Sequence, residues 1–536
     1  MQNEILWKSD LGNGKFKNPF LFADYSDPDV IRVGDTYYLT ASSFNYTPGL
    51  PILTSHDLVN WKLVNYAIDN ISEAGKRHEE ILKSFDIPRH SEGVWAPAIR
   101  YHDGMFYIYY GMPDEGIYVV RTKDPLGKWE EPVCVLEGKG LIDSCPFWDE
   151  DGKAYIIHGY AKSRIGFKSI LGIFEMSLDG MKAITEDHFV FDGNDPKHPA
   201  LTIEGPKVYK RNGFYYILAP AGGVKQGWQV ALRSKNIYGP YEIHTVMEQG
   251  NTVINGPHQG GLVDTVNGDE WFIHFQDKGL YGRICHLQPV TWMEDWPVMG
   301  VNIDNERLCG EPVIECAMPN TGVHDDITYL QSSDDFEGGI YGLQWQWLAN
   351  HYENFVRKND NKGLILNALK LYTDEEPVLW KCPNVLTQKL VCPEFEMEIE
   401  IDIDGLSNGD KAGVIMMGGQ YAYAAVSLRN DKYELCYYES CGSDSDKKDV
   451  LVEKDELDIK DKKKLMFKMI FKKNSKDKPV LNIFYSFDGH EFEKTACEFE
   501  PSDHTWVGAK TGIFCISEND NSTGFAKFNN VKTKSL

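Results

Sequence analysis

The chain has 536 residues, a formal net charge of −25 at pH 7 and an isoelectric point near 5.0. This charge argues against nucleic acid and anionic membranes as partners, because their phosphate groups would be repelled. The opening stretch MQNEILWKSD lacks a basic segment followed by an apolar one, and no run of about 18 apolar residues occurs. We therefore expect a cytoplasmic protein that binds neither nucleic acid nor a membrane.

Cysteine and aromatic content narrow the class of protein. The 11 cysteines are odd in number and contain no C-x-x-C pair, so neither a disulfide framework nor a structural zinc site is indicated. Aromatic residues make up 12% of the chain and glycines number 48, which suits a β-rich protein with flat faces for stacking on sugar rings. The length predicts two domains, and the sequence leaves open whether copies form a homo-oligomer.

A unit of strand, tight turn and strand recurs five times in the first part of the chain. The copies are DPDVIRVGDTYYLT from Asp27, WAPAIRYHDGMFYIYY from Trp95, DSCPFWDEDGKAYIIH from Asp143, EGPKVYKRNGFYYILA from Glu204 and HQGGLVDTVNGDEWFIHF from His258. Each contains a G-D, D-G or N-G dipeptide between strand-forming residues, which is typical of a β-hairpin. Residues 1–325 are therefore predicted to form a five-bladed β-propeller, with a sandwich of many short strands as the alternative.

The repeated unit disappears near residue 325. From residue 330 to residue 536 the chain shows short alternating stretches separated by polar turns, among them FEMEIEIDID, AGVIMMGG, YAYAAVSLR and VLNIFYSFDG. Alternation of apolar and polar residues over short segments is typical of a β-sandwich. The predicted fold class is therefore all-β, with a propeller followed by a sandwich.

Three of the five repeats open on a carboxylate, namely Asp27, Asp143 and Glu204. The innermost strands of a propeller start at one mouth of its channel, so these side chains are expected to converge. Each acid alone is well explained as a turn or cap residue. Three carboxylates close together repel one another, so ionising all three costs free energy. Hydrolysis of a glycosidic bond needs one protonated and one ionised carboxyl group. We expect an ionised Asp143 to keep Glu204 protonated as a proton donor.

The repeats also carry a family resemblance. The relevant stretches are DYSDPDVIRVGDTYYLTASSF, GVWAPAIRYHDGMFYIYYG, GLIDSCPFWDEDGKAYIIHG, IEGPKVYKRNGFYYILAPAGG, GPHQGGLVDTVNGDEWFIHFQD and YGRICHLQPVTWMEDWPVMG, followed by DDFEGGIYGLQWQW and GIFCISE. Over nearly its full length the chain resembles glycoside hydrolase family 43, in particular the two-domain β-xylosidases. The resemblance implies that residues 330–536 form a concanavalin-like β-sandwich.

The resemblance implies roles for individual residues. Asp27 matches the general base, Asp143 the residue that modulates and orients the acid, and Glu204 the general acid. The residues implied to bind substrate are Phe44, Trp95, Phe147, His258 and Arg283. The family inverts the anomeric configuration, so base and acid should stand roughly 6.5 to 9.5 Å apart. No cofactor is required. The family allows a calcium ion beside His258, although the sequence shows no dense cluster of oxygen ligands.

Structural explanations compete with several of these roles. His258 could be a core histidine bonded to a backbone group, and Arg283 a strut paired with a carboxylate. Trp95 and Phe147 could be ordinary core aromatics. Asp29 departs from the family pattern, because relatives often have a small or neutral residue at this position. Asp24 is a further acid near Asp27. We favour Asp27 as the base because it opens the strand directly before proline.

The leading functional hypothesis is an exo-acting, inverting glycosidase that releases terminal xylose from β-1,4-xylooligosaccharides. An α-L-arabinofuranosidase, or a bifunctional enzyme, is the alternative, because both sugars can place similar hydroxyls around the same acids. A non-catalytic carbohydrate-binding protein would not need three converging acids. An endo-acting arabinanase would have an open groove, whereas the appended second domain favours a closed pocket.

Overall fold

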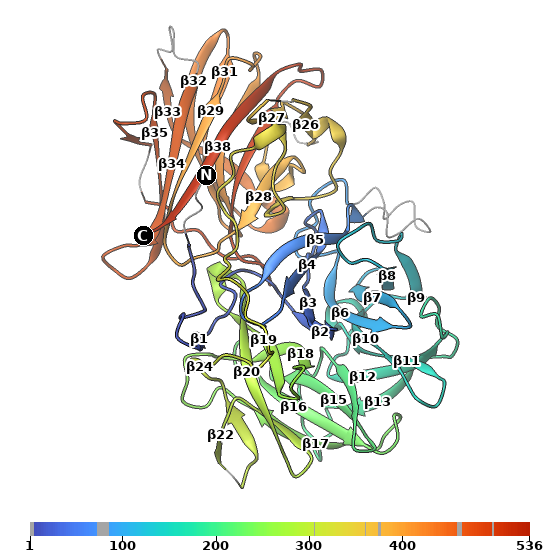
Figure 1. Ribbon diagram of the computed structural model, residues 1–536. Coiled ribbons are helices and arrows are strands. Elements are labelled where there is room, and N and C mark those ends of the chain that lie inside the picture. Colours follow the sequence, from blue (N-terminus) through green and yellow to red (C-terminus); the bar gives the residue numbers. More distant parts are fainter. Residues whose placement is uncertain are drawn as a thin grey trace.

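The computed structural model describes residues 5–71, 85–304, 306–359, 361–372, 377–457, 464–495 and 498–536. It is an all-β protein in which a five-bladed propeller packs against a β-sandwich (Figure 1). In the described ranges, α-helix is limited to α2 (Lys162–Ile165), and none of their helices has the length and apolar character needed to cross a membrane. Single 3-10 turns are η2 (Gly279–Tyr281), η3 (Glu337–Gly339), η4 (Glu353–Phe355), η5 (Leu379–Lys381) and η6 (Asp444–Asp446).

Each blade is built on four consecutive antiparallel strands, and the first strand of each is the innermost. Blade I contains β2 (Asp29–Val33), β3 (Thr36–Thr40), β4 (Gly49–Ser55) and β5 (Lys62–Ile68). Blade II contains β6 (Trp95–His102), β7 (Met105–Met112), β8 (Gly116–Thr122) and β9 (Val133–Glu137). Blade III contains β10 (Leu141–Trp148), β11 (Ala154–Tyr160), β12 (Ile170–Met176) and β13 (His188–Asp192). Blade IV contains β14 (Lys207–Arg211), β15 (Phe214–Ala221), β16 (Trp228–Ser234) and β17 (Glu242–Met247). Blade V contains β18 (His258–Asp264), β19 (Glu270–Asp277), β20 (Arg283–Met293) and β21 (Trp296–Met299).

Local turn chemistry explains the innermost hairpins. Asn212 and Gly213 join β14 to β15 with φ angles of 50° and 76°, and Asp103 and Gly104 join β6 to β7 with φ angles of 47° and 76°. Positive φ at both central residues is the conformation of a two-residue turn whose twist matches the flanking strands. Asn, Asp and Gly adopt it at little cost, so these dipeptides set the hairpin register locally.

The ring closes without exchanging a strand between the first and last blades. β18 packs beside β2, and Arg32 Nε donates to the Asp264 carbonyl at 3.2 Å across this junction. The segment before blade I adds β1 (Lys15–Lys17), which pairs with β24 (Glu315–Ala317). The sheet of blade IV continues with β23 (Cys309–Glu311) and β22 (Val301–Asp304), so it has six strands.

The second domain consists of two seven-stranded sheets. The inner sheet contains β25 (Trp345–Trp347), β28 (Val385–Lys389), β37 (Lys510–Ser517), β30 (Asp410–Met417), β31 (Ala422–Arg429), β32 (Lys432–Cys441) and β33 (Lys448–Glu456). The outer sheet contains β26 (Val356–Arg357), β27 (Leu364–Asn367), β38 (Phe525–Ser535), β29 (Phe395–Asp402), β34 (Lys464–Lys473), β35 (Pro479–Ser486) and β36 (Glu493–Lys494). The predicted boundary at residues 325–330 falls between β24 and β25.

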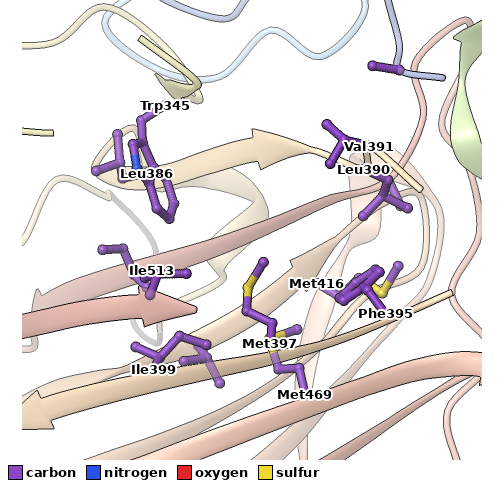
Figure 2. Close-up of a cluster of buried hydrophobic side chains, with 14 of the residues drawn as sticks. Trp345, Leu386, Leu390, Val391, Phe395, Met397, Ile399, Met416, Met469 and Ile513 are labelled. Atoms are coloured by element: carbon purple, nitrogen blue, oxygen red, sulfur yellow. The ribbon is translucent and has the colours of Figure 1, made fainter. Parts of the chain in front are cut away.

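The inner sheet is covered on both faces, which explains its continuous apolar sequence. On β30, Val414 and Met416 belong to the core between the two sheets, part of which is shown in Figure 2. Ile415 and Met417 point the other way, into an apolar cluster shared with the propeller residue Trp95. Successive side chains alternate between faces, so a strand buried on both sides has few polar positions. The sandwich therefore packs closely against the part of the propeller that carries Trp95.

Asp24 ties the two domains together at this contact. Its Oδ1 accepts the Arg283 N–H at 2.9 Å, and its Oδ2 accepts the Gly508 N–H at 3.0 Å and lies 3.5 Å from Lys510 Nζ. A Cβ on Gly508 would lie 2.4 Å from the Gly282 nitrogen, so the two backbones touch here. This contact fixes the loop before β37 over one mouth of the propeller.

Candidate active site

The backbone is irregular where the innermost strands begin. The ladders of β6, β10 and β18 with their neighbours are interrupted between Trp95 and Ala98, between Ile142 and Cys145, and between His258 and Gly260. A bulge of this kind re-aims a side chain that a regular strand would bury in the sheet. Non-glycine residues with positive φ also gather here, namely Asp27, Phe44, Ala96, Asp143, Thr202 and Gln259. Such backbone strain persists where the surrounding structure demands it and clusters at functional sites.

All six of these residues line one cavity of about 320 Å³ at this mouth of the channel. The other lining residues are Trp95, Ile142, Tyr160, Ala161, Lys162, Ser163, Lys168, Glu204, Gly223, Val224, Arg283 and Trp506. The structure thus brings together the three predicted catalytic acids and three of the five residues predicted to bind substrate. A cavity of this size with aromatic walls and a few convergent polar groups is the usual form of a small-ligand site.

Asp27 is buried and held as a charged acceptor. Its Oδ1 accepts from Arg283 Nη1 at 2.9 Å, and its Oδ2 accepts from Ser26 Oγ at 2.8 Å and Ser42 Oγ at 2.6 Å. Hydrogen bonds donated to a carboxylate favour its ionised form. Arg283 therefore acts on this carboxylate through an ion pair, the strut role considered above, and its side chain also reaches the cavity wall.

Asp143, in β10, and Glu204, in the segment before β14, lie close together. A Cβ on Gly159 would be 3.8 Å from both Asp143 Oδ2 and the Glu204 Cα, and the Gly205 N–H donates to Asp143 Oδ2 at 2.8 Å. Burial raises the pKa of Asp143 to about 8; the carboxyl groups of Glu204 and Asp27 add to this rise. Burial and the two neighbouring carboxyl groups thus favour the protonated form of Asp143.

The raised pKa of Asp143 differs from the expectation that Asp143 is ionised. The Asp143 side chain is buried with one backbone donor, whereas Glu204 is 29% exposed and its Oε1 lies 2.9 Å from His258 Nε2. Burial favours the neutral form of Asp143, whereas Glu204 keeps contact with solvent and a hydrogen-bond partner in His258.

The neighbouring acid Asp29 has a structural role. It is fully buried, and its Oδ2 accepts from the Ile99 N–H at 2.9 Å and from Arg100 Nη1 at 2.6 Å, which joins blade I to blade II. Asp24 bonds to the Arg283 backbone and to the sandwich rather than to the cavity. Of the three acids in this stretch, Asp27 is the one that lines the cavity.

One predicted wall residue, Phe147, lies elsewhere, which corrects the sequence expectation. It follows Asp143 by four residues, about 13 Å along β10, and it faces a hollow at the other end of the innermost strands. Its ring packs edge-on to Tyr215 at 6.1 Å, as a core aromatic would. His258 does not line the cavity; it lies behind Glu204 and bonds to it.

The residues around His258 do not fit a calcium site. Its Nδ1 is buried with no hydrogen-bond partner in the part of the chain that the structure describes. Within the same ranges there is no cluster of three or more His, Cys, Asp or Glu side chains able to hold a metal. Calcium needs six to eight oxygen ligands, which the described side chains around His258 do not supply.

Trp506 is a cavity residue that sequence reasoning missed. It comes from the sandwich, in the loop before β37, and its ring lies edge-on to Trp95 at 4.6 Å. Ser91 Oγ and His504 Nδ1, 2.7 Å apart, hold one side of this loop, and the Gly508 N–H bonded to Asp24 holds the other. No local sequence pattern marks Trp506, because its place in the site depends on how the two domains dock.

We expect Trp506→Ala to raise KM for small substrates about three- to tenfold with little change in kcat, because one aromatic wall contributes about 0.5–1.5 kcal/mol to binding. The side chain is 36% exposed, so stability should change little. Steady-state kinetics test this expectation, and Trp506→Phe should recover most of the affinity. A KM unchanged in the alanine variant would show that the ring does not touch substrate.

Comparison with known proteins identifies the family of this chain. Residues 16–297 match the family described as Glycosyl hydrolases family 43, and residues 333–534 match the Beta xylosidase C-terminal Concanavalin A-like domain. The chain belongs to glycoside hydrolase family 43. It is therefore a glycoside hydrolase, and the three converging acids are its candidate catalytic groups.

Relatives of this family 43 enzyme carry two kinds of name. A beta-xylosidase of Formosa agariphila is 31% identical over 559 residues, covering 96% of this chain and 89% of that protein. A non-reducing end alpha-L-arabinofuranosidase of Bacteroides ovatus is 29% identical over 400 residues, covering 69% of each chain. The structure of a xylan beta-1,4-xylosidase from Bacillus halodurans superposes with a TM-score of 0.80 at 21% identity, covering 97% of this chain and 100% of that one, which shows a shared fold.

Proposed function

We propose that this family 43 enzyme is an exo-acting, inverting β-xylosidase that removes terminal xylose from β-1,4-xylooligosaccharides. The observation that carries the proposal is the single cavity of about 320 Å³ that holds Asp27, Asp143 and Glu204 and has Trp506 of the sandwich in its wall. A cavity of this size suits the end of a chain rather than its middle. The match to β-xylosidases through the second domain supports xylose as the terminal sugar.

In the proposed mechanism Asp27 is the general base. Its ion pair with Arg283 and its bonds from Ser26 and Ser42 keep it ionised and oriented. Asp27 would take a proton from a water molecule as that water attacks the anomeric carbon from the face opposite the leaving group. Arg283, which already bonds to Asp27, would also contact hydroxyls of the terminal sugar.

Glu204 is the proposed general acid, and Asp143 is its proton reserve. A bound sugar would displace water from Glu204, which is 29% exposed in the free protein, and this desolvation favours the neutral form of the side chain. The proton shared by the pair would then move from Asp143 to Glu204, which delivers it to the leaving oxygen. The ionised Asp143 left behind stabilises the protonated Glu204, so the predicted modulating role applies to the complex with substrate.

The pH dependence of activity should show this shared proton. Because the pKa of Asp143 is raised to about 8, the pair keeps its proton below that pH and loses it above. We expect kcat/KM for an aryl xyloside to fall as pH rises through about 8. In Asp143→Asn this fall should occur at lower pH. If kcat/KM falls at the same pH in the wild type and in Asp143→Asn, the proposal of a proton shared with Asp143 would be contradicted.

Product analysis by NMR tests the function as a whole. Incubation with xylotriose should release xylose from one end, and the first xylose formed should be the α anomer, since inversion of a β-linkage gives α. Arabinosylated xylan and arabinan belong in the same panel, because one relative carries the name alpha-L-arabinofuranosidase. Release of arabinose alone would reject the xylosidase proposal, and release of β-xylose would reject inversion.

A further inference from the structure

A second cavity, of about 340 Å³, lies between blade I and the sandwich. Its walls come from β5, β28, the loop before β2 and the segment that links the two domains. The lining residues are Tyr25, Lys62, Leu63, Val64, Tyr66, Tyr329, Leu330, Gln331, Leu343, Gln344, Gln388, Lys389 and Val391. None of them lines the active-site cavity, so this space is separate from the site described above.

The charge of this cavity is opposite to that of the whole chain. Its described lining includes two lysines, Lys62 and Lys389, and no aspartate or glutamate, although the chain has a net charge of −25. Positive charge in the wall of a partly enclosed space favours an anion. Phosphate is a poor fit, because aliphatic side chains and tyrosine rings form much of the wall.

Lys389 is the more enclosed of the two lysines in this wall. Its Nζ donates to the neutral Gln346 Oε1 at 2.8 Å and lies 5.2 Å from the centre of the Tyr25 ring. Among the described residues, no carboxylate lies within ion-pair distance of this amine. Burial lowers the pKa of Lys389 to about 7, nearby Lys510 lowers it further and Asp24 opposes the shift. An amine without a counterion in such a place is costly to charge, and a bound anion would offset that cost.

The size and walls of the cavity restrict the kind of anion. A volume of 340 Å³ equals that of about ten water molecules in the liquid, which accommodates one ring with short substituents. Leucine and valine side chains and three tyrosine rings suit an aromatic body. The amides of Gln331, Gln344 and Gln388 supply partners for a hydroxyl group.

We propose that this interdomain cavity binds a small aromatic monocarboxylate, with its carboxylate paired to Lys389 and its ring against Tyr25. The site is independent of the hydrolytic reaction and of its substrate. Its ligand belongs to a different chemical class from the neutral sugars expected in the active site.

Isothermal titration calorimetry with 4-hydroxybenzoate tests the proposal near pH 6, with the full-length protein. We expect one binding site in the wild type and at least about tenfold weaker binding of the uncharged methyl ester. Lys389→Met should weaken 4-hydroxybenzoate binding by about the same factor. The matched control is Lys411→Met, which removes a buried lysine of the same sandwich that bonds to Tyr438 outside this cavity, and it should bind like the wild type.

Three results would overturn the proposal: no heat of binding to the wild type, equal binding of acid and ester, or equal binding to wild type and Lys389→Met. The last would place the anion at another site, such as the lysines at the rim of the active-site cavity. Hydrolysis of an aryl pentoside shows that each variant is folded. If Lys389→Met fails to fold, the exposed Lys62→Gln replaces it and should still weaken binding severalfold.

Discussion

Replacing Glu204 by glutamine is expected to lower kcat on xylooligosaccharides by about 10²- to 10⁴-fold, the usual contribution of a general acid. Glutamine has the same shape and can still bond to His258, so substrate binding and stability should change little. The loss should depend on the leaving group. An aryl xyloside with an acidic phenol leaves without needing a proton, so its hydrolysis should fall far less than that of xylobiose.

This dependence separates a general acid from a residue that only shapes the site. Steady-state kinetics on xylobiose and on a nitrophenyl xyloside measure both losses. Glu270→Gln is a matched control and should leave both rates unchanged, since Glu270 pairs with Arg211 beside the hollow at the other end of the innermost strands. Equal losses on the two substrates in Glu204→Gln would contradict the assignment of Glu204 as the acid.

Replacing Asp27 by asparagine is expected to abolish turnover of both kinds of substrate, with a loss of at least about 10³-fold. An amide cannot take a proton from the attacking water, and water is needed whatever the leaving group. Melting temperature should fall less than in the Asp29 control below, because the loss of the pair with Arg283 is partly offset by relief of repulsion from Asp143 and Glu204.

Asp29, two residues away, provides the contrasting control. Its carboxylate pairs with Arg100 between two blades, so Asp29→Asn should destabilise the protein by about 3 kcal/mol through the uncompensated arginine. The remaining folded protein should still turn over substrate below its melting temperature. Thermal unfolding and activity assays on the two variants together test the assignment; an active Asp27→Asn enzyme would move the base to another residue.

Much of the architecture follows from local sequence. Dipeptides such as Asp103–Gly104 and Asn212–Gly213 adopt the turn conformation of a hairpin by themselves, and alternation such as that of β29 sets which face is buried. Both effects act over a few residues, so they can be recognised without knowing the rest of the fold. The repetition of this unit predicts a propeller. The position of the acids at the start of the repeats predicts that they meet at one mouth of its channel.

Other features of the site depend on contacts between distant segments. Bulges in β10 and β18 aim Asp143 into the cavity and His258 behind Glu204, while the regular part of β10 after the bulge carries Phe147 to the opposite end. The raised pKa of Asp143 depends on burial and on two carboxylates far away in sequence, and Trp506 reaches the cavity only through domain docking. Residue types and turn signals act locally and are visible in the chain, whereas desolvation, charge coupling and interdomain contact arise only when separated segments meet.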